Sequence, residues 1–196
     1  EVVSDPTNVL ALECARRLRE NSAAIVRLAT SHRCVRAQAV PKVPGFAAHF
    51  RMFCLATGGH ERPNREFTSD ALIEHIRTHL AALDRLERHG YAFPGREIRI
   101  LATEANAALA DRIASAFSAR TVVREPLTHD YYAGLRFMIH VRAPTDEPVP
   151  FIDGGAFDWL QRLTSNSKLV FVASAMGSQL AAFLFRRAVQ GAAHPP

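Results

Sequence analysis

The stretch Asp130-Tyr131-Tyr132-Ala133-Gly134-Leu135-Arg136-Phe137 decides the predicted fold, together with Asp153-Gly154-Gly155-Ala156-Phe157-Asp158 after a loop. From Leu135 to Arg142 apolar and polar side chains alternate, which is the period of a half-buried β-strand. The second piece is predicted to be a diglycine turn that opens a short helix, because glycine permits close backbone approach. Two tyrosine hydroxyls beside such a turn predict a compact pocket for a small polar molecule. The alternative is a hairpin whose tyrosines pack half-buried.

The composition is that of a folded domain. The 196 residues are 48% hydrophobic and 22% charged, enough for one core of ordinary size. No apolar run approaches the roughly 18 residues of a membrane span, so no membrane association is expected. The cysteines Cys14, Cys34 and Cys54 form no CxxC pair, which predicts reduced cytoplasmic thiols and no metal cluster. The net charge of +5 permits an anionic ligand such as a nucleotide but is weak evidence for nucleic acid.

Strands are predicted to follow one another largely without intervening helices. Asp5-Pro6 favours a helix start, and Thr68–His89 carries an apolar stripe at helical spacing. Ala175–Val189 is predicted to be the last helix, after the strongly apolar strand Lys168–Ser174. Further strands are expected at Ala23–Arg36, His49–Thr57, Arg96–Ala102, Thr121–Arg124 and the Tyr-Tyr stretch. This order indicates an α+β fold with a mainly antiparallel sheet.

Other residue patterns are less specific. His75 and His79 lie four apart on the long predicted helix, a spacing compatible with zinc, but no third ligand is placed, and a solvated helix face is preferred. Ser174 and Ser178 flank a strand-to-helix turn that is not the G-x-S-x-G nucleophile motif. No P-loop or Rossmann glycine motif is present.

Three arginines lie on two neighbouring predicted strands. Arg33, Arg36 and Arg51 could hold a phosphate or a carboxylate through bidentate hydrogen bonds. The alternative is that they decorate exposed strand faces, and the residues alone leave both interpretations open.

The order of these segments resembles the catalytic core of histidyl-tRNA synthetase and of its non-charging relative, the regulatory subunit of ATP phosphoribosyltransferase. The family's Leu-Asp-Tyr-Tyr-Thr-Gly strand is similar to His129–Gly134, and its Gly-Gly-Arg-Tyr-Asp turn is similar to Gly154–Asp158. Its Pro-Glu-Gly-Thr segment resembles Ser4–Thr7. Its motif 2 strand pair resembles His32–Val35, a loop and then Ala48–Phe53, and its motif 3 corresponds to Gly177–Leu180. The resemblance covers about residues 4 to 187.

The departures from the family pattern concern its charged groups. Gln179 stands where motif 3 would supply an arginine to ATP, and Val35 stands where motif 2 would supply a glutamate. Met52 and Ala56 replace the polar residues of the amino-acid pocket, and Leu127 stands where the family has an arginine. Adenylate formation needs positive charge where pyrophosphate charge develops, so these changes indicate a degenerate site.

The resemblance implies a fold and a site. The fold would be α+β, class II aminoacyl-tRNA synthetase-like, with a mainly antiparallel sheet and helices packed on one face. Residues 1–196 would form a single domain that lacks motif 1 and any anticodon-binding domain. The two long helices would share that face through Ile76, Leu80, Leu83, Leu180, Phe183 and Leu184. The ligand-binding residues would be Asp5, Thr7, Arg33, Tyr131, Tyr132, Gly154, Gly155 and Gln179, with Asp5 and Thr7 holding a ligand amino group.

Three functions remain open at this point. The first is a non-charging paralogue that binds a small amino-acid-like or nucleotide ligand and acts as a regulatory or partner subunit. The second is an adenylate-forming ligase that activates an amino acid and would use ATP with Mg²⁺ as its cofactor. The third is a structural remnant that pairs with another chain. Without motif 1 the sheet should expose an edge, which predicts a homodimer or a hetero-complex. Neither tRNA nor a metal centre is an expected partner.

Overall fold

The structure, a computed structural model, describes residues 3–37, 39 and 47–187. Its elements in chain order are α1 (Pro6–Glu20), β1 (Val26–Val35), β2 (His49–His60), η1 (Pro63–Arg65), α2 (Glu66–Glu87), β3 (Glu97–Ala102), η2 (Glu104–Asn106), α3 (Ala107–Ser115), β4 (Val122–Pro126), β5 (Leu135–Arg142), β6 (Pro148–Phe157), α4 (Trp159–Thr164), β7 (Leu169–Gly177) and α5 (Ser178–Leu184). Among these helices, none is long and apolar enough to cross a membrane.

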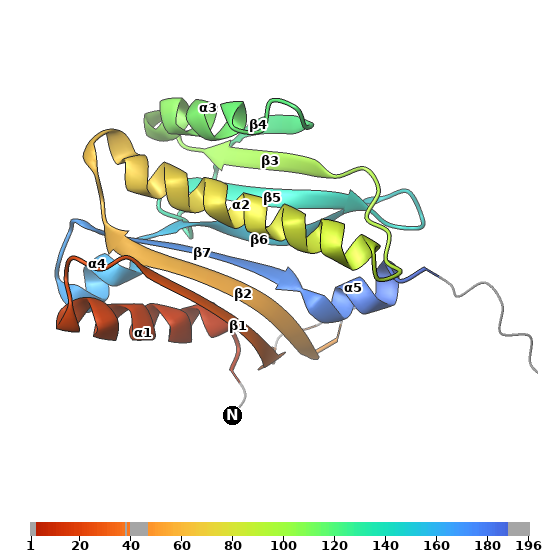
Figure 1. The fold of residues 1–196 in the computed structure, drawn as a ribbon, viewed down its shortest axis with the longest axis horizontal. Helices are drawn as coiled ribbons and strands as arrows, with labels where there is room; N and C mark the ends of the chain where they lie inside the picture. The colour runs from red at the N-terminus through yellow and green to blue at the C-terminus, as the bar shows by residue number, and fades with distance from the viewer. Residues whose placement is uncertain (1–2, 38, 40–46, 188–196) are drawn as a thin grey trace, which may run out of the picture.

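One sheet organises the molecule (Figure 1). Its seven strands lie in the order β1-β2-β7-β6-β5-β3-β4. Every neighbouring pair is antiparallel except β3 and β4, which run parallel. The predicted α+β class with a mainly antiparallel sheet is therefore confirmed. Strand β7, predicted from its apolar sequence, lies inside the sheet between β2 and β6, where both of its faces are buried.

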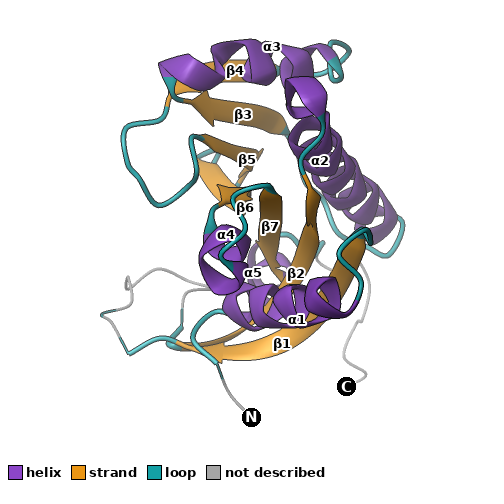
Figure 2. Ribbon diagram, turned by 90° about the vertical axis from the view of Figure 1, so that its left-hand side faces the viewer, coloured by secondary structure: helices purple, strands orange, loops and turns teal. Residues whose placement is uncertain are grey.

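Helices cover both faces of the sheet (Figure 2). The expectation of helices on one face holds for α2, α3 and α5, which share one apolar core with the sheet. Helices α1 and α4 pack instead on the opposite face, where Cys14, Leu18 and Leu160 meet Phe171 and Ala173 of β7. Strand side chains alternate between faces, so a strand that is apolar on both sides requires cover on both.

The stripe on α2 is buried as predicted. Leu72, Ile76, Leu80 and Leu83 are each at most 3% exposed and pack on the sheet. Helix α5 is shorter than predicted, because β7 stays paired with β2 as far as Gly177. The helix also ends earlier than predicted, at Leu184, and beyond it Arg186 bridges to Tyr91; the predicted last residue, Val189, lies outside the described residues.

The contact predicted for Phe183 is wrong. Its side chain on α5 is 66% exposed, whereas Ala181 and Phe185 are the buried residues of that helix region. Leu180 and Leu184 pack partly against the shared core, as expected.

The predicted diglycine turn is also wrong, because Gly154 and Gly155 lie inside β6 and pair with Ser174 and Ala173 of β7. A Cβ atom at Gly154 would lie 2.4 Å from the Ser174 Cβ, and one at Gly155 would lie 2.4 Å from the Leu135 carbonyl oxygen. The glycines are therefore required by close packing within the sheet, and the helix they were expected to open starts only at Trp159.

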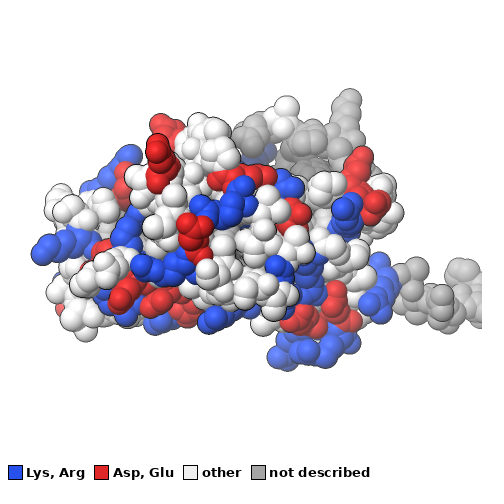
Figure 3. All heavy atoms as spheres, turned by 90° about the horizontal axis from the view of Figure 1, so that it is seen from above, with Lys and Arg blue, Asp and Glu red and all other residues white. Residues whose placement is uncertain are grey.

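Charge is interleaved on the surface. On the face shown in Figure 3, acidic and basic side chains lie next to one another. Ion pairs between such side chains occur in the molecule, for example Arg99 with Glu125 at 2.8 Å. The net charge of +5 therefore does not gather into one basic surface on that face.

Candidate functional site

A pocket of about 550 Å³ lies where the start of α1 meets β2, β6 and β7. The Tyr131-Tyr132 turn closes one side of it, and the first turn of α5 borders another. Its polar or ionisable lining side chains include Asp5, Thr7, Arg36, Tyr131, Tyr132, Asp153 and Gln179. Apolar walls come from residues such as Phe50, Met52 and Phe157. A few polar groups in a mainly apolar hollow are typical of small-molecule sites.

Asp5 is fixed at the pocket because it caps α1. Its Oδ1 accepts hydrogen bonds from the Thr7 backbone N–H at 2.9 Å and from the Thr7 hydroxyl at 2.7 Å. Pro6 occupies the first helical turn, where its missing N–H costs nothing. No described group bonds to Asp5 Oδ2, so one carboxylate oxygen remains able to accept from a ligand ammonium.

Tyr132 belongs to a charged cluster on the pocket wall. Its hydroxyl donates to Asp153 Oδ1 at 2.9 Å, and the Arg136 guanidinium donates to both Asp153 oxygens at 2.9 and 2.7 Å. The guanidinium also lies 5.3 Å from the centre of the Tyr132 ring. Burial, reinforced by the Asp153 carboxylate, raises the pKa of Tyr132, so the phenol stays protonated. Its oxygen keeps lone pairs that can accept from a ligand.

Tyr131 lies at the rim of the pocket and is 54% exposed. Its ring meets Tyr132, Phe157 and Trp159 edge-on, with centroids 5.0 to 6.3 Å apart. Burial of its inner part and the charges of Asp5 and Asp153 raise the pKa of Tyr131. The tyrosine pair therefore supplies an aromatic wall with two neutral hydroxyls.

Of the three arginines on the two predicted strands, Arg36 and Arg51 are among the residues that line the pocket, whereas Arg33 is not. Arg33 is exposed and lies six residues after Arg27, whose side chain reaches Glu74 of α2, so both side chains point to the face that carries α2. Arg36 lines the pocket and places its guanidinium 5.1 Å from the centre of the Phe50 ring. The sequence contains a signal for the position of Arg36. Residues two apart on a strand share a face, so Arg36 lies on the same face as the buried residue Cys34.

Of the other predicted ligand-binding residues, some line the pocket and one does not. Gly154 and Gln179 line the pocket. Gly155 is not among its lining residues, and a Cβ there would lie 2.5 Å from the Tyr132 ring, so it supports that ring from behind. Asp153 and Arg136 were not predicted as site residues, although both lie within the stretches that carry the tyrosines and glycines.

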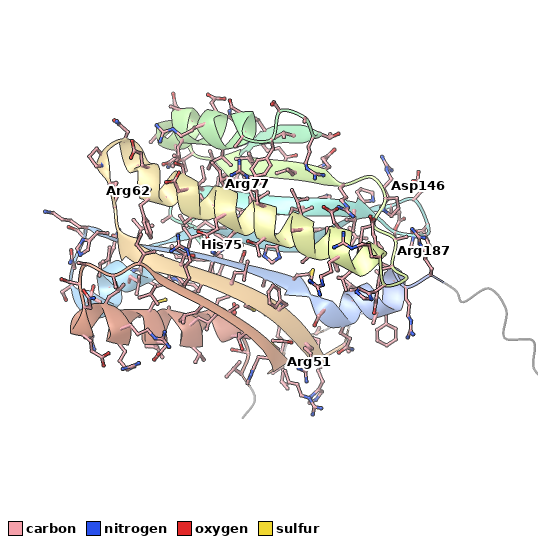
Figure 4. The ribbon with its side chains drawn as sticks, viewed as in Figure 1. Arg51, Arg62, His75, Arg77, Asp146 and Arg187 are labelled. Carbon is pink, nitrogen blue, oxygen red and sulfur yellow. The ribbon has the colours of Figure 1, made fainter. Side chains whose placement is uncertain are left out.

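His75 and His79 are buried, at 2% and 0% exposure, so their assignment to a solvated helix face is wrong. His75 bonds to the Thr57 hydroxyl at 3.0 Å and to the Ser174 hydroxyl at 2.9 Å, and His79 bonds to Ser174 at 2.8 Å. Figure 4 labels His75 on α2. Burial lowers the pKa of His75 to about 3 and that of His79 to about 4, so both rings are neutral. The two histidines thus attach α2 to β7 on the face opposite α1.

The fit of the site to MgATP depends on its metal-ligating side chains and its cations. Within residues 3–37, 39 and 47–187, no group of three or more metal-ligating side chains is placed to hold a metal ion. Gln179 borders the pocket where the family's motif 3 would supply a cation. A magnesium-bound triphosphate needs oxygen ligands and fixed positive charge, and the described lining offers the cations Arg36 and Arg51 but no grouped set of metal-ligating side chains.

No protein-family model matches the chain, and no curated protein matches it in sequence. Its fold matches an apo histidyl-tRNA synthetase of S. aureus at TM-score 0.63 and 13% identity, over 89% of this chain and 48% of that one. It matches an ATP phosphoribosyltransferase regulatory subunit/histidyl-tRNA synthetase from Bacillus halodurans C at TM-score 0.64 and 15% identity, over 92% and 63%.

A third match is a structure described as the RNA-binding domain of threonyl-tRNA synthetase from Cryptosporidium parvum Iowa II, at TM-score 0.63 and 13% identity, over 91% of this chain and 48% of that one. Identities this low establish a shared fold alone. The class II synthetase-like fold expected from the resemblance is confirmed. The chain spans about half of the length of the S. aureus and Cryptosporidium proteins.

Proposed function

We propose that this chain is a non-charging, histidyl-tRNA synthetase-like protein that binds a small amino-acid-like ligand and serves as a regulatory or partner subunit. One observation carries the proposal: the Asp5 carboxylate, the Arg36 guanidinium and the two tyrosines line a single pocket. An anion and a cation in one small hollow suit the opposite charges of an amino acid. The ammonium would bind Asp5 and Thr7, and the carboxylate would bind Arg36.

The walls favour the same class of ligand. Phe50, Met52 and Phe157 offer apolar surface to a ligand side chain, and Tyr132 with Asp153 offers hydrogen-bond acceptors. A fold match described as a regulatory subunit gives a precedent for this fold in a regulatory role. Association with another chain remains part of the proposal.

The test is a thermal-shift screen of the purified chain against the common amino acids, AMP and ATP. A ligand at 100 times its dissociation constant stabilises the folded state by about 2.7 kcal/mol. One or a few amino acids should raise the melting temperature, with histidine as the first candidate. A screen in which no amino acid shifts the transition, at concentrations up to the millimolar range, would remove the support for this function.

The ligase alternative needs its own assay. ATP–pyrophosphate exchange with the stabilising amino acid measures adenylate formation directly. Because Gln179 replaces a cation at the pocket border, exchange should stay at the level of the buffer blank. Exchange above that level would replace the proposed function with the ligase.

A further inference from the structure

Strand β1 has a free edge. It is the first strand of the sheet, and among the described residues its partners are β2 and, at its end, Val3, which bridges to Cys34. On its other side the Val35 backbone N–H donates to the Val3 carbonyl oxygen at 3.0 Å. Backbone groups point to alternate sides along a strand, so those of Arg27, Ala29, Ser31 and Arg33 point the same way as Val35. Within the described part of the chain, nothing bonds to them there.

The side chains beside this edge are exposed and basic. Arg27, Ala29, Ser31 and Arg33 all lie open on the face that carries α2. Arg27 is neutralised by Glu74 of α2 at 2.8 Å. Arg33 lies directly opposite Arg51, an arrangement that is destabilising for like charges, and neither pairs with an acid among the described residues. The strand ends near Arg51 extend past α2 (Figure 4), so that helix does not cover them.

We propose that an extended segment of a partner protein adds to the free edge of β1, with an acidic side chain next to Arg33. Strand addition satisfies the outward backbone groups, and pockets or charges on alternate residues give specificity. A residue paired with Arg33 would point to the same face and bring its carboxylate beside the unpaired arginines. This inference rests on the proposed role as a partner subunit and assigns that role a surface.

A second copy of this chain fits the edge less well. Antiparallel pairing of two β1 strands about Thr30 would place Arg27 of each copy opposite Arg33 of the other. That arrangement adds like charges where two arginines already face each other. Charge complementarity therefore favours an acidic strand over self-pairing.

The probe is a short fluorescent peptide of alternating glutamate and threonine, with a matched peptide in which lysine replaces glutamate. Fluorescence polarisation should show the acidic peptide binding at least tenfold more tightly. Hydrogen exchange supplies an internal control. Peptide binding should slow exchange at the amides of Arg27, Ala29, Ser31 and Arg33, while the amides between them already bond to β2.

Two variants separate the backbone from the charge. Ala29→Pro removes an outward N–H without touching the β2 ladder, so it should abolish peptide binding. Arg33→Glu should reverse the preference toward the lysine peptide. Arg77→Glu, an exposed charge reversal on α2, is the matched control and should bind like the wild type. The amino-acid thermal shift can also be measured on Ala29→Pro, because the pocket does not include Ala29. The proposed ligand pocket and the proposed strand-binding edge can therefore fail separately.

Each contrary result overturns the inference. If neither peptide binds, or if both bind equally, an acidic strand is excluded as the occupant of the β1 edge. Binding that Arg33→Glu abolishes but Ala29→Pro leaves intact indicates an anion held by arginine alone, such as RNA. Concentration-dependent self-association that Ala29→Pro abolishes makes the occupant a second copy of this chain.

Discussion

At the scale of single residues, the pocket depends on which face of a strand each side chain occupies. Arg33 and Arg36 differ by three positions, so they point to opposite faces, and only Arg36 reaches the pocket. Gly155 shows the same dependence, because the space that its side chain would fill is taken by the Tyr132 ring. Local composition suggested both glycines and arginines as site residues, but only the hairpin register decides which of them face the ligand.

Gly155→Ala is expected to destabilise the fold by about 1–3 kcal/mol, the usual effect of overpacking a dense interior. The new methyl group would lie 2.4 Å from the Leu135 oxygen and 2.5 Å from Tyr132, and the backbone oxygen cannot move aside easily. Urea unfolding measures the change. Gly177→Ala is the control, because its nearest neighbour is the Leu180 Cβ at 3.3 Å, and its effect should be smaller. Equal effects at the two sites would contradict the packing argument.

At the scale of elements, α2 is held to the sheet by polar as well as apolar contacts. His75 and His79 both bond to Ser174, and His75 also bonds to Thr57 of β2. Buried polar groups that are bonded cost little, whereas a buried charge costs much. This attachment therefore requires both imidazoles to be neutral.

The stability of the protein should consequently fall in mild acid. The folded pKa values of His75 and His79, about 3 and 4, lie below the ordinary value of 6.5. The unfolded chain therefore binds protons first as the pH drops below about 6.5. The contribution of the two histidines to the free energy of unfolding is fully present above that pH. As the pH falls from there toward the folded pKa, it declines by up to ~1.4 kcal/mol per pH unit for each histidine. Urea unfolding between pH 7.5 and 5 measures the slope.

His79→Phe removes one of these titrations and should reduce that slope by about 1 kcal/mol per pH unit or somewhat more. His49→Gln, at an exposed position on β2, should leave the slope unchanged. Carboxylates titrate alike in all three proteins, so the difference isolates the buried ring. A slope in His79→Phe equal to that of the wild type would mean that the ring is not held neutral by burial.

At the scale of the whole molecule, much of the architecture follows from local periodicity. The α2 stripe and the apolar β7 strand were predictable because each pattern reports its own burial. The positions of α1 and α4 on the second face, and the burial of His75, depend on contacts between distant segments. Asp153 was missed for the same reason, because its partners Tyr132 and Arg136 lie on other segments of the chain.

The confirmed fold by itself does not establish the activity of its structural neighbours, since one fold supports many functions. The chain should not attach an amino acid to tRNA, because Gln179 stands at the pocket border where the family's motif 3 would supply an arginine to ATP. Incubation with total tRNA, ATP and labelled amino acids should give no acid-precipitable product above a no-enzyme blank. Product formation that depends on the protein would show a functional synthetase site.

Calorimetric titration of the stabilising amino acid into the wild type and Asp5→Asn tests the central claim most directly. Asparagine still caps α1, so the helix stays in place while the charge that would hold the ligand ammonium is lost. The account predicts binding to the wild type that weakens about 10–100-fold in Asp5→Asn, the effect of removing a hydrogen bond to a charged group. Asp146→Asn, at a turn outside the pocket lining, should bind like the wild type. Equal affinities for the wild type and Asp5→Asn would contradict the account.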